Sequence, residues 1–130
     1  MSKPPNLPDE VLQFIARRID SVPHLEALLL LRENASVGWT NQEVAGRVYV
    51  SVERAGAILA SLCHDGFIVM SHEEPGDYRY NEAWDQNGLM AMVASSYRQQ
   101  LVQVASLIHA KNASVAVRDF ARAFEFKKKD

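Results

Sequence analysis

Residues 39–80 read WTNQEVAGRVYVSVERAGAILASLCHDGFIVMSHEEPGDYRY, and the order of signals in this stretch predicts its fold. Thr40 followed by Glu43 has the spacing of a capping box, in which each side chain accepts a hydrogen bond from the other residue's backbone N–H. We therefore expect a helix to begin directly after Thr40. Ser51 is a suitable N-cap for a second helix, and Gly66 suits the left-handed position that ends it. The stretch predicts two short helices joined by a tight turn.

The second helix, expected over residues 52–65, has one apolar face and one small, polar face. Spacings of three and four place its apolar residues on the inner side, namely Ala55, Ile58, Leu59 and Leu62. Residues 67–71 and 77–81 have the composition of strands, and Glu74, Pro75 and Gly76 supply the turn between them. Helix, turn, helix and two-stranded hairpin in this order predict a winged helix-turn-helix.

Two helices are expected before this unit. The first spans Asp9 to Ile19, after a proline-containing start. Ser21 is an N-cap for the second, with Pro23 in its first turn, and this helix reaches about Arg32. Its four consecutive leucines require burial on most sides. Trp39 is expected in a short strand just before the next helix.

After the hairpin, apolar residues recur at spacings of three and four within a polar background. This pattern predicts one long amphipathic helix over residues 86–110, about 35 Å in length at 1.5 Å per residue. Such a rod is longer than a small domain, so we expect part of its stripe to pack on a second copy and form a homodimer. The expected dimerisation residues are Met90, Val93, Tyr97, Leu101, Val104 and Ile108. A last short helix carries Val117, Phe120, Ala121 and Phe124.

The predicted fold class is thus mainly α within the α+β class. Residues 1–20 form an N-terminal extension and helix, residues 21–82 the winged helix-turn-helix, and residues 83–130 a helical extension that acts as the dimerisation arm. The length of 130 residues and the 48% apolar content suit a single compact unit. No apolar stretch is long enough for a membrane span, no signal peptide is recognisable, and Cys63 excludes an internal disulfide because it is the only cysteine. We expect a bacterial, cytoplasmic protein.

The charge balance counts against tight DNA binding by the central unit alone. The whole chain carries a net charge of −2, whereas nucleic-acid binders usually present a basic face to phosphates. Residues 40–82 contain three arginines and seven carboxylates, a net charge of −4. The only concentration of basic residues in the sequence lies near the C-terminus, at Arg118, Arg122, Lys127, Lys128 and Lys129.

Double-stranded DNA is nevertheless the first partner to consider, because the second helix of such a unit is shaped to enter a major groove. Arg54 is its strongest base reader, since arginine forms two hydrogen bonds with guanine. The candidate DNA-binding residues are Thr40, Ser51, Glu53, Arg54, Ala57, Ser61 and Arg79.

Two other functions stay open. The nearly apolar outer face of the second helix, with Ala57, Ala60 and Ser61, also suits a protein partner such as a sigma factor or a signalling protein. A small-ligand sensor would use a crevice between the long helix and the hairpin, with Trp84 and Tyr97.

The sequence contains no pattern typical of an enzyme. We find no Ser, His and Asp arrangement, no glycine-rich phosphate loop and no HExxH pair. Cys63, His64 and His72 are spread over a helix end and a hairpin, which is a weak signal for a metal site. We expect no catalytic residues, no metal and no cofactor.

The stretch TNQEVAGRVYVSVERAGAILASLCHDGFI, residues 40–68, resembles the winged-helix domains of bacterial MarR-like transcriptional regulators, and the likeness extends over residues 21–81. The leucine-rich helix and the ending VRDFARAFEFKKK, residues 117–129, also resemble a group of small, largely uncharacterised proteobacterial winged-helix proteins. The resemblance implies transcriptional regulation, with Val52–Asp65 as the recognition helix. The contact residues that it implies are Ser51, Arg54, Ser61 and Arg79.

Overall fold

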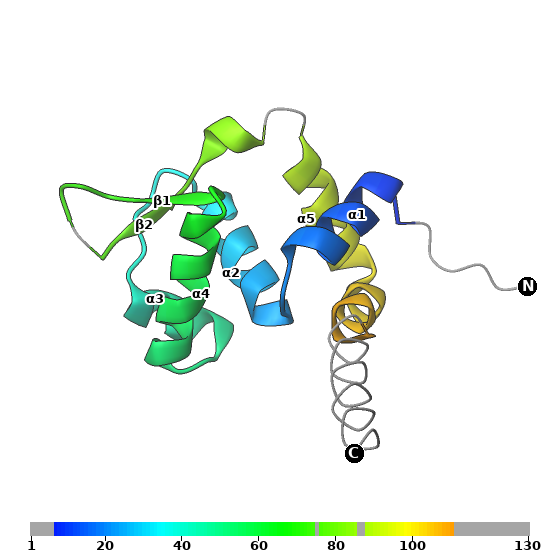
Figure 1. The fold of residues 1–130 in the computed structure, drawn as a ribbon, viewed down its shortest axis with the longest axis horizontal. Coiled ribbons are helices and arrows are strands. Elements are labelled where there is room, and N and C mark those ends of the chain that lie inside the picture. Colours follow the sequence, from blue (N-terminus) through cyan, green and yellow to red (C-terminus); the bar gives the residue numbers. More distant parts are fainter. Residues whose placement is uncertain (1–6, 75, 86–87, 111–130) are drawn as a thin grey trace, which may run out of the picture.

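The computed structural model describes residues 7–74, 76–85 and 88–110, which are mainly helical with one small antiparallel sheet (Figure 1). Residues 101–110 form a further helical segment. In chain order the bounded elements are α1 (Asp9–Arg18), α2 (Val22–Glu33), α3 (Asn41–Val48), α4 (Val52–His64), β1 (Ile68–Met70), β2 (Tyr78–Tyr80), the 3₁₀ helix η1 (Glu82–Trp84) and α5 (Leu89–Gln99).

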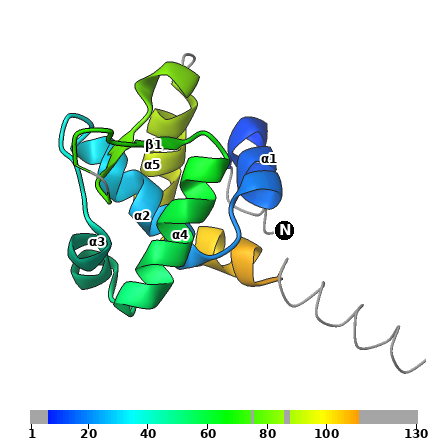
Figure 2. The same ribbon diagram turned by 60° about the vertical axis from the view of Figure 1, so that its left-hand side comes forward.

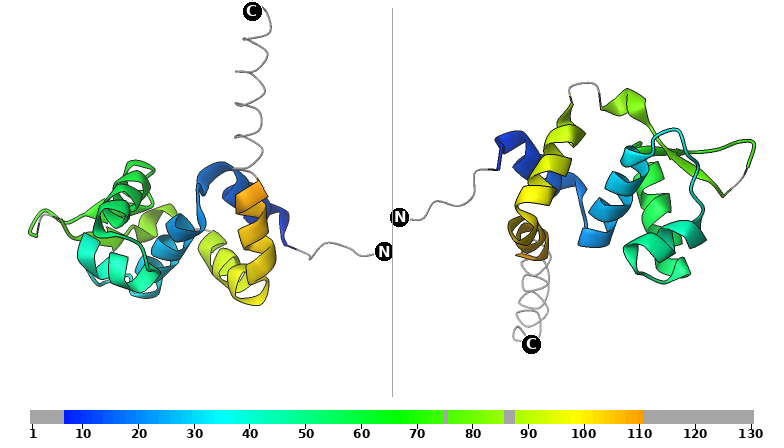
Figure 3. Two further views of the ribbon diagram at one scale, coloured as in Figure 1. Left: turned by 90° about the horizontal axis from the view of Figure 1, so that it is seen from below. Right: turned by 180° about the vertical axis from the view of Figure 1, so that it is seen from behind.

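α2 lies in the middle of the helices, with α3 and α4 on one side and α1 and α5 on the other (Figures 1 and 3). It packs against α3, α4 and β2, while α1 packs against α5. Its leucine run is buried on nearly every side, as the sequence predicts, because each neighbour covers a different part of the helix. The buried residues of α2 are Leu25, Ala27, Leu28, Leu29, Leu30 and Leu31.

Side-chain caps fix the starts of α2, α3 and α4 where the sequence places them. The backbone N–H of His24 donates to Ser21 Oγ at the start of α2, with Pro23 in the first turn. Just after the C-terminal end of α4, Gly66 has a φ of 87°, the left-handed conformation that glycine adopts without a Cβ penalty. These boundaries are set by short-range hydrogen bonds, so the sequence is sufficient to locate them.

The hairpin is antiparallel and extends to Trp39. β1 and β2 pair in the register Ile68 to Tyr80, Val69 to Arg79 and Met70 to Tyr78. Trp39 and Tyr78 exchange two backbone hydrogen bonds of 2.8 Å, so an isolated antiparallel bridge stands where the short strand is expected. β1 lies across the C-terminal end of α4, from which it follows directly (Figure 2).

An aromatic cluster connects α1 to the hairpin. The ring of Phe67 lies 5.6 Å from that of Phe14 and 4.6 Å from that of Trp84, and Tyr80 meets Trp84 edge-on at 6.5 Å. Arg18 places its guanidinium 4.6 Å above the Phe67 ring. α1 is therefore part of the same core as the hairpin.

The prediction of a single long helix over residues 86–110 is wrong. α5 ends at Gln99, and Gln100 leaves the helical region with a φ of −134° and a ψ of 52°. Residues 101–110 then turn sharply away from the axis of α5 (Figure 3). The break lets Val104 and Ile108 reach the core of the same chain, where both are fully buried. Burial of these side chains favours the bend over a straight rod.

Some expectations lie outside the described residues, namely the turn residue Pro75, the short helix around Phe120 and the lysines at 127–129. Within the described ranges, no helix is both long and apolar enough to cross a membrane.

Candidate nucleic-acid interface

α3 is held at both ends by local hydrogen bonds. Thr40 Oγ1 accepts from the N–H of Glu43 at 3.1 Å, and Glu43 Oε1 accepts from the N–H of Thr40 at 3.0 Å, so the predicted capping box is confirmed. The helix ends at Tyr49, whose N–H donates to the carbonyl of Ala45. The hydroxyl of Thr40 is thus engaged in the cap.

A three-residue turn, 49–51, leads from α3 into α4. Ser51 Oγ accepts from the N–H of Arg54 at 3.0 Å, and this cap starts α4 at Val52 as expected. The Ser51 side chain is exposed. Its hydroxyl can still donate a hydrogen bond, because the cap uses the oxygen only as an acceptor. Arg54 projects from the first turn of a helix whose N-terminus carries partial positive charge.

The two faces of α4 differ as the sequence predicts. The inner residues Ala55, Ile58, Leu59 and Leu62 are all buried, and α4 packs through them on α2 and α3. The outer side chains are small or charged and lie open to solvent over about 20 Å of helix. They are Glu53, Arg54, Ala57, Ala60 and His64, which are exposed, and Ser61, which is half-buried.

The arginines of the molecule fall into two groups. Arg18 donates to the carbonyl of Asp65 at 3.3 Å, and Arg47 lies 5.4 Å above the ring of Trp39, so both serve the fold. Arg54 and Arg79 are exposed, and no hydrogen bond, ion pair or ring contact of either guanidinium is found among the described residues. The sequence analysis selected both of these arginines.

The hairpin turn is acidic and well ordered by its own hydrogen bonds. Ser71 Oγ accepts from the N–H groups of Glu73 and Glu74, both at 3.2 Å, and both carboxylates are exposed. A phosphate backbone would be repelled by this tip. Arg79 lies on β2, opposite exposed Val69, and is the basic group that the described part of the hairpin offers.

The candidate DNA-binding residues therefore lie along α4 and its two flanks. Ser51, Glu53, Arg54, Ala57 and Ser61 follow one another on the outer face of α4. Thr40 belongs to the cap of α3, and Arg79 belongs to the hairpin. The first five thus belong to α4 and its N-cap, whereas the other two belong to different elements.

The expected dimerisation residues do not form a free surface stripe. Four of the six are fully buried in the core of their own chain, Tyr97 is half-buried, and only Leu101 is exposed. Leu101 at 50% and Val102 at 75% are the large apolar side chains exposed after the bend at Gln100. The four buried ones are Met90, Val93, Val104 and Ile108.

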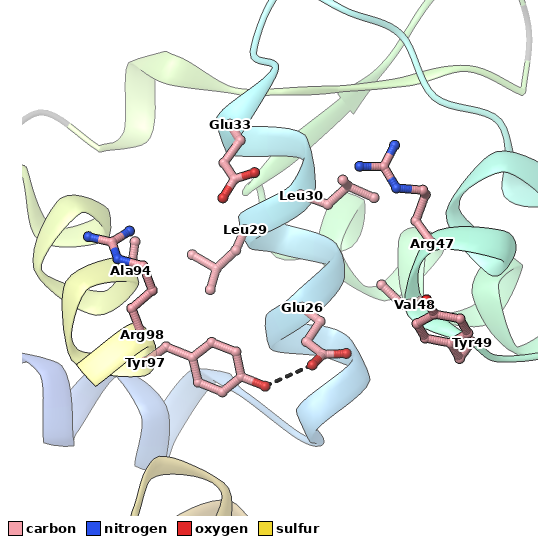
Figure 4. A pocket seen from close by; sticks show the side chains of 10 residues that line it. All are labelled: Glu26, Leu29, Leu30, Glu33, Arg47, Val48, Tyr49, Ala94, Tyr97 and Arg98. Atoms are coloured by element: carbon pink, nitrogen blue, oxygen red, sulfur yellow. Dashed lines mark hydrogen bonds between the residues drawn. The ribbon is translucent and has the colours of Figure 1, made fainter. Parts of the chain in front are cut away.

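Sequence reasoning missed a groove on the opposite side of the molecule (Figure 4). It has a volume of about 300 Å³, and α2 forms its floor between α5 and the end of α3. Tyr49 and Tyr97 both line it. The crevice expected between the long helix and the hairpin is not built as predicted, because Trp84 packs in the aromatic cluster while Tyr97 faces α2.

Tyr49 has an unusual backbone. Its φ of 61° is the one positive value among the described non-glycine residues, and its side chain is 91% exposed. A bulky residue in this conformation is rare. The sequence offers no signal for it, because glycine or asparagine usually occupies such a position.

The described part of the chain has no group of three His, Cys, Asp or Glu residues arranged to hold a metal ion. Cys63 is half-buried, whereas His64 and His72 are exposed.

Comparison with protein families, with characterised proteins and with solved structures finds no match to this chain.

Proposed function

We propose that the chain is a winged-helix transcriptional regulator that binds double-stranded DNA through α4. One observation carries the proposal: α4 is buried along one face by its own domain and largely exposed along the other, which has the exposed Arg54 in its first turn. The order of α2, α3, α4 and the hairpin matches the order of a winged helix-turn-helix.

In this proposal α4 lies in the major groove. The guanidinium of Arg54 donates two hydrogen bonds to a guanine, and the small side chains of Ala57 and Ala60 let the helix approach the base edges. Ser51 donates its hydroxyl to a phosphate beside the N-terminus of α4, and Arg79 neutralises a second phosphate. The acidic tip of the hairpin stays out of the minor groove.

Few phosphate contacts give a shallow dependence of affinity on salt. With one phosphate neutralised by Arg79, the slope of log K against log salt is about −1. Fluorescence anisotropy with sites selected from a random duplex library measures both affinity and slope. Failure to enrich any duplex from a folded sample would remove the proposal.

Arg54→Ala should weaken binding to the selected site by roughly 10- to 100-fold, the value of one bidentate base contact. Arg17→Ala is the matched control, because Arg17 is equally exposed but lies on α1. Equal losses for the two variants would show that Arg54 acts only through its charge.

A protein-interaction module is the second candidate, favoured by the acidic hairpin tip and the small outer face of α4. Glu53→Lys separates the two functions, because Glu53 sits beside Arg54 on that face. The variant should strengthen DNA binding and weaken the binding of a basic protein partner. A pull-down and an anisotropy titration, each with the unaltered chain and with Glu53→Lys, show whether the substitution strengthens DNA binding or weakens the binding of a protein partner.

A further inference from the structure

The floor of the groove on α2 is apolar in the middle and acidic toward both ends. Leu29 and Leu30 are almost buried and lie between Glu26 and Glu33, which are about 10 Å apart along the helix axis. Figure 4 shows the end of α3 on one side of this floor and α5 on the other. The groove is large enough for a small organic molecule with an apolar body.

Glu26 is held in a fixed position within this groove. The hydroxyl of Tyr97 donates to Glu26 Oε2 at 2.8 Å, which orients the carboxylate from the α5 side. Burial and the neighbouring carboxylate raise the pKa of the Tyr97 phenol, so it remains a proton donor at neutral pH. Glu26 is half-buried, and a charge interacts more strongly there than in open water.

Two aromatic rings flank that carboxylate. In the view of Figure 4, Glu26 lies between Tyr97 on the α5 side and Tyr49 at the end of α3. Tyr49 is held in a left-handed conformation and 91% exposed, so its ring adds little to the core. Aromatic faces attract cations, and a carboxylate beside them adds to that attraction.

The two arginines of the groove are poorly placed to bind an anion together. Arg47 already has its guanidinium over the ring of Trp39. Arg98 lines the groove from α5 but is exposed, so solvent screens its charge. Glu33 lies near the same end of the groove and repels an anion there.

We propose that this groove binds a small cation with an apolar body. The cationic group lies beside Glu26 between the rings of Tyr49 and Tyr97, and the apolar body covers Leu29 and Leu30. The site is separate from the outer face of α4, so the proposal holds whether or not α4 binds DNA.

Benzyltrimethylammonium is a suitable probe, with neopentylbenzene as its uncharged isostere and phenylacetate as an anion of similar size. An NMR titration of the full chain should place the shifts caused by benzyltrimethylammonium on α2, the end of α3 and α5. The cation should bind at least tenfold more tightly than either comparison compound. Tighter binding of phenylacetate, or no saturable binding of the cation up to about 10 mM, would overturn the proposal.

Glu26→Gln removes the charge but keeps an acceptor for Tyr97, and it should weaken cation binding at least tenfold. Glu53→Gln makes the same charge change on the outer face of α4 and should leave the affinity within twofold. Tyr49→Gly removes one ring and relieves the left-handed strain, so cation binding should weaken while the protein stays folded. Equal affinities for the Gln variants at 26 and 53 would mean that net charge alone attracts the probe, which would refute the site.

Discussion

α2 and α4 are helices of similar length, 12 and 13 residues, and both begin at a serine cap. They differ in how much of their surface the fold uses. α2 is covered by α3, α4 and β2 and keeps only a strip that forms the floor of the groove. α4 is covered on one side and presents its whole outer side to solvent. A helix enclosed by its own domain contributes stability, whereas a helix covered on one side also offers a surface to a partner.

The largest expected difference between α2 and α4 is in how much a substitution changes the free energy of unfolding. Leu28→Ala in α2 removes a fully buried side chain and leaves a cavity, so the free energy of unfolding should fall by about 2–5 kcal/mol. Ala60→Ser on the outer face of α4 should change it by less than about 0.5 kcal/mol. Urea denaturation followed by circular dichroism measures both. A small loss for Leu28→Ala would contradict the central place of α2.

The serine caps offer a closer comparison. Ser21→Ala and Ser51→Ala should each lower the free energy of unfolding by about 1 kcal/mol, because each leaves a backbone N–H without its acceptor. The loss should be larger at Ser21, whose half-buried hydroxyl also lies 2.7 Å from Nδ1 of His24. Thermal unfolding of both variants tests this order, and a larger loss at the exposed Ser51 would reverse it.

A substitution in the turn that leads into α4 should raise the free energy of unfolding. Tyr49→Gly places a residue without a Cβ at a φ of 61°, so the free energy of unfolding should rise by roughly 0.5–1 kcal/mol. The ring contributes little packing that could offset this gain, since it is almost fully exposed. A lower midpoint in urea for the glycine variant would show that the ring does stabilise the groove.

The smallest effect should come from pH, through the hydrogen bond between Tyr97 and Glu26 of α2. Burial and the hydrogen bond to Glu26 raise the pKa of Tyr97 above its ordinary value near 10. Ionisation is therefore easier in the unfolded chain, so this contribution to stability is complete below pH 10 and is lost as the pH rises above it. Solvent screening at this half-exposed position keeps the effect small.

Unfolding curves between pH 9 and 11 should fall less steeply for Tyr97→Phe than for the unaltered chain. Tyr78→Phe is a control with a tyrosine that does not contact α2 through a hydroxyl hydrogen bond. Identical slopes for the unaltered chain and Tyr97→Phe would show that the hydroxyl and Glu26 do not interact in solution.

Several parts of this fold follow from neighbouring residues in the sequence. Ser21, Thr40 with Glu43, Ser51 and Gly66 locate four helix boundaries, because each acts through hydrogen bonds or dihedral angles within one turn. The spacing of the apolar residues likewise predicts the buried face of α4. The exposed face of the same helix contains most of the candidate interface. These features need no knowledge of distant contacts.

The long helix shows where such reasoning fails. The stripe from Met90 to Ile108 keeps a helical period, and no proline or glycine marks an interruption. The bend at Gln100 places Val104 and Ile108 in the core of the same chain, a gain that depends on distant segments and not on neighbouring residues. A periodic stripe states that a face is buried but not which surface covers it.

By itself, then, the sequence determined the helix starts, the hairpin and the two faces of α4, since each depends on residues a few positions apart. Only the tertiary structure decided the bend at Gln100, the left-handed Tyr49 and the groove over α2. These depend on packing between segments as distant as Glu26 and Tyr97, whose contact no local pattern encodes. Burial of apolar surface selects among the arrangements that local signals permit.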